Sequence, residues 1–291
     1  MKTTHQENMR SHLMLAAVLC SAAMASTAAH ADAGQWAHDD EQQCEGYTNA
    51  AAVQAALSTA VRTVSAYGAG LGNNMWATVV DANGVVCLVV NTGGGGAGSV
   101  ESIWLGSRVI SAQKANTANA FSLSARSAGT AIALSTANLY TAVQPGGSLY
   151  GLQASNPVDT FVAYGGSVGR YGTGTQDPMV GKLIGGVNVF GGGLAIYSPT
   201  GQRLGAIGVS GDTSCTDHAV AWETRHALGL DYVPGGISPN HDDNIIYDIT
   251  PQAGQMPGIS AGGFGHPHCL KPAAETTVLM ALPAVRPQRV L

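Results

Sequence analysis

Two strand–turn–strand segments place this chain among proteins built on an antiparallel sheet. Residues 75–90 are rich in β-branched residues on either side of the turn DANG, and residues 193–209 repeat this pattern around the turn SPTG. A doubly wound parallel sheet would need a helix between successive strands. Helical periodicity occurs outside the hairpins, over residues 48–66, 103–121 and 214–228. We therefore expect an α+β domain, in which helices pack on an antiparallel sheet.

The rest of the chain divides into segments of different character. Residues 145–193 hold many of the 39 glycines and few periodic apolar positions, which predicts a long ordered loop region. A short helix is expected just before it, over residues 135–143. After the domain, which we place at 48–232, the sequence turns to Gly, Pro, Asn and Asp. Residues 233–291 are therefore predicted to be an irregular C-terminal extension.

The first residues have the pattern of an export signal. Two basic residues precede an apolar stretch over 13–25, and an A-x-A site follows at 29–31. We expect cleavage before Asp32, which makes residues 1–31 a signal peptide and 32–47 a polar leader, and places the protein in the periplasm or outside the cell. The alternative is a buried N-terminal helix. The later sequence has no stretch of ~20 uninterrupted apolar residues, so no membrane span is predicted.

Four cysteines remain after cleavage: Cys44, Cys87, Cys215 and Cys269. An even number in an exported chain favours disulfides, and the lack of a C-x-x-C motif disfavours a zinc knuckle or a thioredoxin-type site. Three pairings are possible, and the sequence does not choose among them. Cys44–Cys87 with Cys215–Cys269 is weakly preferred because it closes two local loops.

Composition and short motifs exclude several functions. Charged residues are 11% of the chain and the net charge is −5. The sequence has no Lys/Arg cluster, which disfavours a nucleic-acid partner. The G-x-S-x-G match at 165–169 lacks the following helix of a nucleophile elbow. The glycine run at 93–98 lacks the Lys-Ser/Thr of a phosphate-binding loop and suggests a mobile loop. His266-Pro-His268-Cys269 could suggest a metal site, although a structural or surface role explains it more simply.

The sharpest candidate site is GAIGVSGDT at residues 205–213, where a strand enters a glycine turn and then a helix. Free N–H groups and the helix dipole at such a start favour an anion such as a carboxylate. In that helix His218, Trp222 and His226 share one face at i, i+4 and i+8. This arrangement suits a flat cofactor that carries carboxylates. The alternative is an ordinary helix whose histidines are satisfied by packing.

The same residues resemble a known family. KANTANAF at 114–121, GGLAIY at 192–197, ATVVDANG at 77–84 and the 205–213 motif are similar to the GlcG/HbpS family of haem-binding proteins. The resemblance covers about residues 48–230. It implies a five-stranded antiparallel sheet with helices, self-association into dimers or larger rings, and haem as the ligand of the better-known members. The long glycine-rich segment and the C-terminal extension depart from the family.

Two function classes follow from these observations. The first is an exported haem-binding protein for carriage, sensing or protection, with haem or another flat carboxylate-bearing molecule near the start of the 214–228 helix. Asp212 and Thr213 would lie in the turn, where Asp212 would cap the helix. Lys114 would supply a counter-charge to the carboxylate, and His218 would ligate the iron. The alternative is a small-molecule or haem-modifying enzyme, in which Lys114, Asp212 and His218 are the acid–base candidates. A structural oligomer without a ligand is a third interpretation.

Overall fold

The computed structural model describes residue 44 and residues 49–125, 132–252 and 255–289, all of which belong to one unit, Ala37–Leu291. The expected signal peptide, and the leader apart from Cys44, lie outside these residues. The helices and strands in chain order are α1 (Ala50–Ser65), β1 (Trp76–Asp81), β2 (Val86–Asn91), η1 (Ala97–Glu101), α2 (Gly106–Ala120), η2 (Thr136–Leu139), η3 (Thr141–Val143), α3 (Leu152–Ser155), α4 (Thr160–Tyr164), η4 (Val168–Arg170), β3 (Thr173–Gly174), β4 (Gly193–Tyr197), β5 (Arg203–Ser210), α5 (Ser214–Ala227), β6 (Ile249–Gln252), β7 (Gln255–Ser260) and α6 (Pro272–Ala281); η marks 3-10 helices.

The main sheet has five antiparallel strands in the order β3-β2-β1-β5-β4, which confirms the α+β class. The two expected hairpins form β1–β2 and β4–β5, and β1 pairs with β5 to join them in one sheet. Both hairpins contain a register shift, between Val79 and Val80 in one and between Ile196 and Tyr197 in the other. None of the described helices has the length and apolar character that crossing a bilayer requires.

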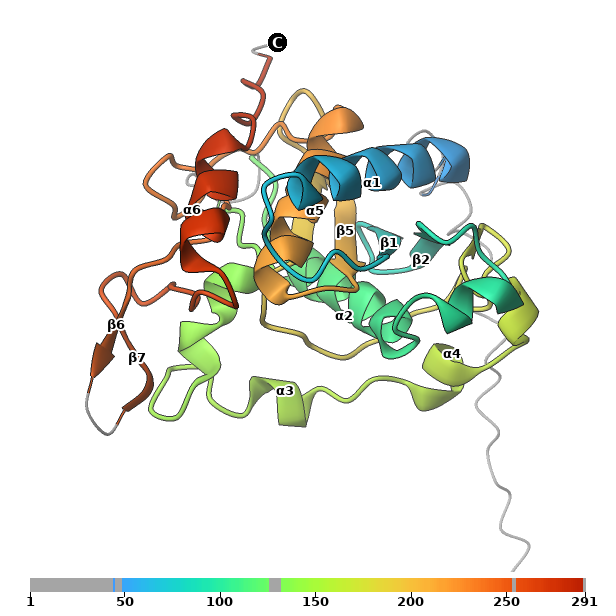
Figure 1. The fold of residues 1–291 in the computed structure, drawn as a ribbon, viewed down its shortest axis with the longest axis horizontal. Helices are drawn as coiled ribbons and strands as arrows, with labels where there is room; N and C mark the ends of the chain where they lie inside the picture. The colour runs from blue at the N-terminus through green and yellow to red at the C-terminus, as the bar shows by residue number, and fades with distance from the viewer. Residues whose placement is uncertain (1–43, 45–48, 126–131, 253–254, 290–291) are drawn as a thin grey trace, which may run out of the picture. The chain divides into compact units, whose positions relative to one another are not determined.

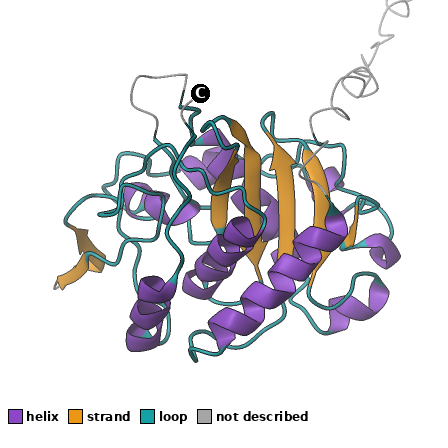
Figure 2. Cartoon of the chain, turned by 90° about the horizontal axis from the view of Figure 1, so that it is seen from above, coloured by secondary structure: helices purple, strands orange, loops and turns teal. Residues whose placement is uncertain are grey.

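Helices cover both faces of this sheet (Figure 2). On one face, α1 and α5 bury apolar side chains such as Leu57 and Val220 against alternate strand residues. On the other face, α2 packs with the glycine-rich segment, to which Met179 and Ile184 belong. Because both faces are covered, β1, β2 and β4 are buried along their whole length. This explains why these strands are apolar at successive positions rather than only at alternate ones.

Gly208 allows α2 to approach β5 closely. A Cβ atom at this position would lie 1.9 Å from the Ser111 carbonyl oxygen and 2.5 Å from the Ala115 nitrogen, both in the α2 backbone. A glycine is therefore needed here for helix–sheet packing. The close contact holds α2, and with it Lys114, against the strand that leads into α5.

The glycine-rich segment contains more regular structure than expected. It forms α3, α4, η4 and the two-residue strand β3, which adds the fifth strand to the sheet. A buried ion pair between Arg108 of α2 and Asp177 attaches the segment, with Arg108 Nε 2.9 Å from the carboxylate. The expected helix over 135–143 is instead two 3-10 turns, η2 and η3, the first begun by a capping box between Ser135 and Asn138.

The expectation of an irregular extension is wrong for part of its length. The ten-residue helix α6 lies beside α5 (Figure 1), and β6 and β7 form a separate two-stranded sheet. Pro272 occupies the first turn of α6, where proline is tolerated because its missing N–H would be unpaired anyway. Val278 of α6 joins the main hydrophobic core. The extension is therefore packed into the domain by apolar contacts.

Candidate functional site

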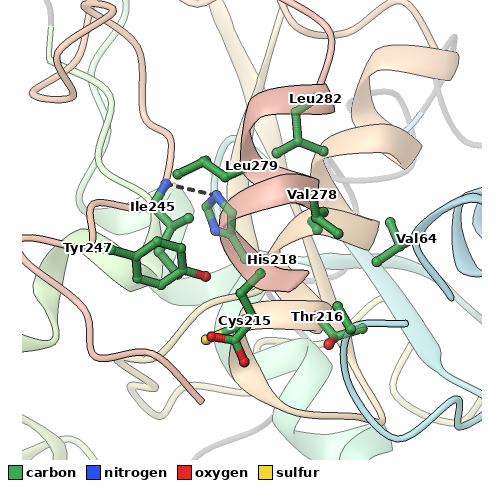
Figure 3. Close-up of a pocket in the computed structure, with 12 residues that line it drawn as sticks. Val64, Cys215, Thr216, His218, Ile245, Tyr247, Val278, Leu279 and Leu282 are labelled. Atoms are coloured by element: carbon green, nitrogen blue, oxygen red, sulfur yellow. Dashed lines mark hydrogen bonds between the residues drawn. The ribbon is translucent and has the colours of Figure 1, made fainter. Parts of the chain in front are cut away.

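A pocket lies between α5 and α6, close to the predicted site (Figure 3). Its walls come from α1 and the loop after it, from α5, and from the C-terminal extension. The lining residues are Val64, Ala69, Cys215, Thr216, His218, Ala219, Ile245, Tyr247, Glu275, Val278, Leu279 and Leu282. Most of these side chains are apolar, and the polar groups are one imidazole, one phenol, one carboxylate and one hydroxyl. The empty space, including its opening to solvent, is about 270 Å³.

His218 is fully buried and is the only histidine among the residues that line this pocket. The Ile245 N–H donates to two acceptors, Asn244 Oδ1 at 2.8 Å and His218 Nε2 at 3.1 Å. Nε2 also lies 3.1 Å from Asn244 Oδ1. Nδ1 has no hydrogen-bond partner among the described residues, and it carries the lone pair in the tautomer whose Nε2 proton is donated to Asn244 Oδ1.

Burial keeps the His218 ring neutral by lowering its pKa from 6.5 to about 3. The contact with Asn244 opposes this shift, whereas the nearby His266, Arg225 and Lys114 add to it. A neutral imidazole with an unpaired nitrogen in an apolar wall is suited to binding a metal ion. The ring also lies near Trp222, with 6.2 Å between centroids, as the shared helical face predicts.

We expect acidification from pH 7 to pH 5 to destabilise the protein by about 2 kcal/mol through His218 alone. Its unfolded form gains a proton in this range and its folded form does not, so its stabilising contribution is complete above pH 6.5 and is lost as the pH falls toward 3. The loss is about 1.4 kcal/mol per unit below 6.5. Denaturant unfolding at both pH values should show a loss about 2 kcal/mol smaller in His218→Gln than in the wild type; equal losses would contradict the buried neutral ring.

Asp212 and Thr213 organise the start of α5. Thr213 is the N-cap, and its side chain accepts a hydrogen bond from the Thr216 N–H. The Asp212 carboxylate accepts the N–H groups of Leu71 (2.8 Å) and Asn73 (3.1 Å), which fixes the loop between α1 and β1. It also accepts the Thr213 N–H. Thr213, and not Asp212 as expected, is therefore the cap of α5, Asp212 holds the loop between α1 and β1 instead, and neither residue lines the pocket.

Lys114 lies on the opposite side of α5 in a buried ion pair that the sequence did not reveal. Its Nζ is 2.7 Å from Asp217 Oδ2 and donates to the Val209 carbonyl oxygen at 3.1 Å. Burial lowers the pKa of Lys114 and raises that of Asp217 to about 6, while their mutual attraction opposes both shifts. Asp217 Oδ1 also accepts the N–H groups of Gly211 and Asp212. A side-chain carboxylate thus occupies the N–H groups that were expected to meet a ligand anion.

The outer wall of the pocket is formed by polar groups that stabilise one another. Glu275 accepts the N–H groups of Cys269, Leu270 and Lys271 at 2.8–3.0 Å, and its carboxylate is 2.9 Å from His268 Nδ1. Burial favours a higher pKa for Glu275, but these hydrogen bonds outweigh it and lower the pKa. The Tyr247 ring stacks on His268 at 4.0 Å, and burial raises the pKa of the phenol. Tyr247 therefore presents a protonated hydroxyl.

The extension is fastened to the domain by a covalent bond and a buried ion pair. The disulfides are Cys44–Cys87 and Cys215–Cys269, the pairing that closes two local loops. Arg225 of α5 forms a bidentate pair with Asp243, with both N–O distances at 2.7 Å. The disulfides are thus the pairing that the sequence weakly favoured. No pattern in the sequence indicates the Arg225–Asp243 pair, whose partners lie 18 positions apart.

The candidates for an enzyme do not share one cavity. Lys114 is paired with Asp217, Asp212 holds the loop between α1 and β1, and only His218 of the three lines the pocket. Ser167 of the G-x-S-x-G match precedes the 3-10 helix η4, whereas a nucleophile elbow needs an α-helix. His226 of the predicted face contacts Asp231 at 2.7 Å and lies outside the pocket.

Together, the sheet and the helices on both faces define an α+β domain with a pocket beside a buried histidine. Over residues 48–225 the chain matches the model of the family described as haem degrading protein HbpS-like. The chain belongs to this HbpS-like family, as the resemblance of its motifs implies. No curated protein matches the chain.

Several solved structures are similar to part of the chain. Klebsiella pneumoniae protein ORFY, of family DUF336, is 25% identical, with 62% of this chain and 88% of that chain covered and a TM-score of 0.37. PduOC in complex with haem is 21% identical, with 60% and 91% covered and a TM-score of 0.37. A double mutant of Streptomyces reticuli HbpS is 19% identical, with 63% and 88% covered and a TM-score of 0.33.

Proposed function

We propose that this protein binds haem between α5 and α6 and that His218 is the protein ligand to the iron. The observation that carries the proposal is the unpaired Nδ1 of a buried, neutral imidazole in an apolar pocket. Membership of a haem-related family supports the same ligand. When bound, haem would supply an iron centre for redox or oxygen chemistry. The protein would hold the iron through His218 and surround the ring with apolar side chains.

The residues that line the pocket have the chemistry that haem requires, but the pocket is too small for haem unless α6 shifts. Val278, Leu279 and Leu282 line the pocket with apolar side chains. The space of about 270 Å³ includes open solvent, and the enclosed part has room for little more than one water molecule, far less than the ~300–1,000 Å³ of small-molecule sites. A porphyrin therefore reaches the imidazole only if part of the α6 wall moves away from α5.

Lys271 is better placed than Lys114 to meet a haem carboxylate. Its Nζ is 2.8 Å and 3.0 Å from the carbonyl oxygens of Gly68 and Gly70, which flank the pocket residue Ala69. Both contacts are to neutral oxygens, and the Lys271 residue is exposed. The ammonium can thus turn toward an incoming anion, whereas the Lys114 ammonium is buried against Asp217.

The proposal includes export to the periplasm or the cell exterior. Two disulfides support it, because such bonds persist in oxidising compartments and are rare in the cytosol. The signal-like pattern at residues 1–31 points the same way. Self-association, which the family resemblance implies, stays a prediction.

A haem titration of the purified protein tests the function. We expect the Soret absorbance to saturate at one haem per chain, with a dissociation constant in the micromolar range or below. No carrier protein such as serum albumin should be added, because it would bind haem itself. Free haem should be titrated in parallel so that its own absorbance can be subtracted. The absence of saturable binding at micromolar concentrations would overturn the proposal.

A further inference from the structure

Three metal-ligating side chains meet at the first turn of α5, next to the pocket. One ligand atom from each of Cys215, His266 and Cys269 lies within 4.8 Å of the other two. Cys215 and His266 are buried, and Cys269 is partly exposed. The two sulfurs are joined in a disulfide, so they are not metal ligands in this state. Two thiolates and one imidazole, however, are a ligand set that zinc uses.

The imidazole of His266 is already oriented for this role. Its Nδ1 lies 2.7 Å from the Pro267 carbonyl oxygen, which can only accept a hydrogen bond, so Nδ1 carries the proton. Nε2 therefore holds the lone pair. It accepts a long hydrogen bond from the Gly191 N–H at 3.4 Å and lies 3.3 Å from Ser214 Oγ, which is itself 3.3 Å from Cys269 Sγ. Metal-binding histidines are commonly held this way, with the other ring nitrogen donating to a backbone carbonyl.

The start of α5 favours a thiolate at Cys269. The Cys215 N–H points at Cys269 Sγ at 3.1 Å, and the Ser214 hydroxyl is within hydrogen-bond distance of the same sulfur. N–H groups in the first turn of a helix stabilise negative charge and lower the pKa of a thiol. Breaking the disulfide would thus place a thiol that loses its proton readily beside the lone pair of His266.

We propose that reduction of the Cys215–Cys269 disulfide by a dithiol creates a Cys₂His site for a thiophilic divalent ion such as Zn²⁺. The dithiol attacks the sulfur–sulfur bond, the chain gains two thiols, and the reductant leaves as its cyclic disulfide after giving up two electrons and two protons. Binding of the ion then replaces both thiol protons, which pass to solvent. Water completes a tetrahedral site. The site does not depend on haem binding.

Cobalt titration tests the proposal with the full chain. The protein is reduced with dithiothreitol, the reductant is removed under anaerobic conditions, and Co²⁺ is added while circular dichroism reports the fold. We expect one Co²⁺ per chain, with thiolate-to-cobalt charge-transfer absorbance, in reduced but not in oxidised protein. The double variant Cys44→Ser/Cys87→Ser should keep this absorbance after reduction, and Cys215→Ser/Cys269→Ser should lose it.

His266→Gln provides a variant that keeps both disulfides during folding. After reduction it should bind Co²⁺ at least about tenfold more weakly than the wild type. Unchanged affinity in His266→Gln, the same absorbance in Cys215→Ser/Cys269→Ser, no charge-transfer band in the reduced wild type, or unfolding of the reduced wild type would each overturn the proposal. A failed haem titration would leave these results unaffected.

Discussion

Replacing Asp243 by alanine should lower the free energy of unfolding by about 3–5 kcal/mol, because it leaves a buried cation without its partner. Arg225 and Asp243 are both completely buried and share two hydrogen bonds of 2.7 Å. Arginine does not give up its proton in proteins. Without Asp243, the guanidinium would keep the Ala195 carbonyl oxygen at 2.9 Å and the face of the Trp222 ring at 4.8 Å. Neither neutral group compensates for the lost carboxylate.

Denaturant unfolding of Asp243→Ala and Asp248→Ala measures this effect against a matched control. Asp248 is also a carboxylate of the extension, but it is partly exposed and accepts hydrogen bonds from Ser260 and Gly262 without a cation. Its loss should lower the free energy of unfolding by only about 1–2 kcal/mol. Equal losses in the two variants, or a loss below about 1 kcal/mol in Asp243→Ala, would show that the pair does not stabilise the fold.

Ending the chain after Val233 should prevent stable folding, although the family match ends at residue 225. The truncation removes Asp243 from Arg225, Cys269 from Cys215, and the Pro283 carbonyl oxygen that accepts the Trp222 Nε1–H at 2.8 Å. Removing one partner of a buried ion pair costs about 3–5 kcal/mol, and losing the disulfide costs about 2–5 kcal/mol. Their sum is comparable to the whole stability of an ordinary domain, about 5–15 kcal/mol.

A chain that ends after Pro287 is the control for this truncation. It keeps α6, the disulfide and the Asp243 pair, and it loses the hydrogen bond from the Arg289 N–H to the Pro199 carbonyl oxygen. Its free energy of unfolding should fall by no more than about 1 kcal/mol. Thermal unfolding followed by circular dichroism compares the two chains. A Val233 truncation that melts at the wild-type temperature would mean that the extension is not part of the folding unit.

Features encoded by neighbouring residues could be predicted from the sequence. The two hairpins follow from β-branched runs around DANG and SPTG, and α5 follows from its periodicity and its capping residues. β3 could not be predicted, because two residues, Thr173 and Gly174, carry no periodicity and pair with β2 only after the chain has folded. α6 was not predicted because prolines flank this ten-residue helix, and because its stability comes from packing on α5 rather than from its own sequence pattern.

The sequence predicted where in the chain the candidate site lies, but it did not predict which residues contact one another there. The 205–213 motif located the start of α5, but of the predicted face of His218, Trp222 and His226 only His218 lines the pocket. Asp217 was missed, although it is an acidic residue in the first turn, because its partner Lys114 lies 103 residues away. The pocket wall formed by Ile245, Tyr247 and α6 also depends on distant segments, and local patterns cannot show which segments meet.

The Soret spectrum of His218→Ala, titrated with haem beside His241→Asn, is the most direct test of the proposed site. His241 is exposed and has a positive φ of 60°, a conformation that asparagine tolerates, so this control removes an imidazole without touching the pocket. We expect His218→Ala to shift the Soret band and to weaken haem binding by roughly tenfold or more, equivalent to about 1.4 kcal/mol, while His241→Asn matches the wild type. His218→Gln serves as the second variant if His218→Ala does not fold. A folded His218 variant that keeps the wild-type Soret band and affinity would contradict iron ligation by this residue.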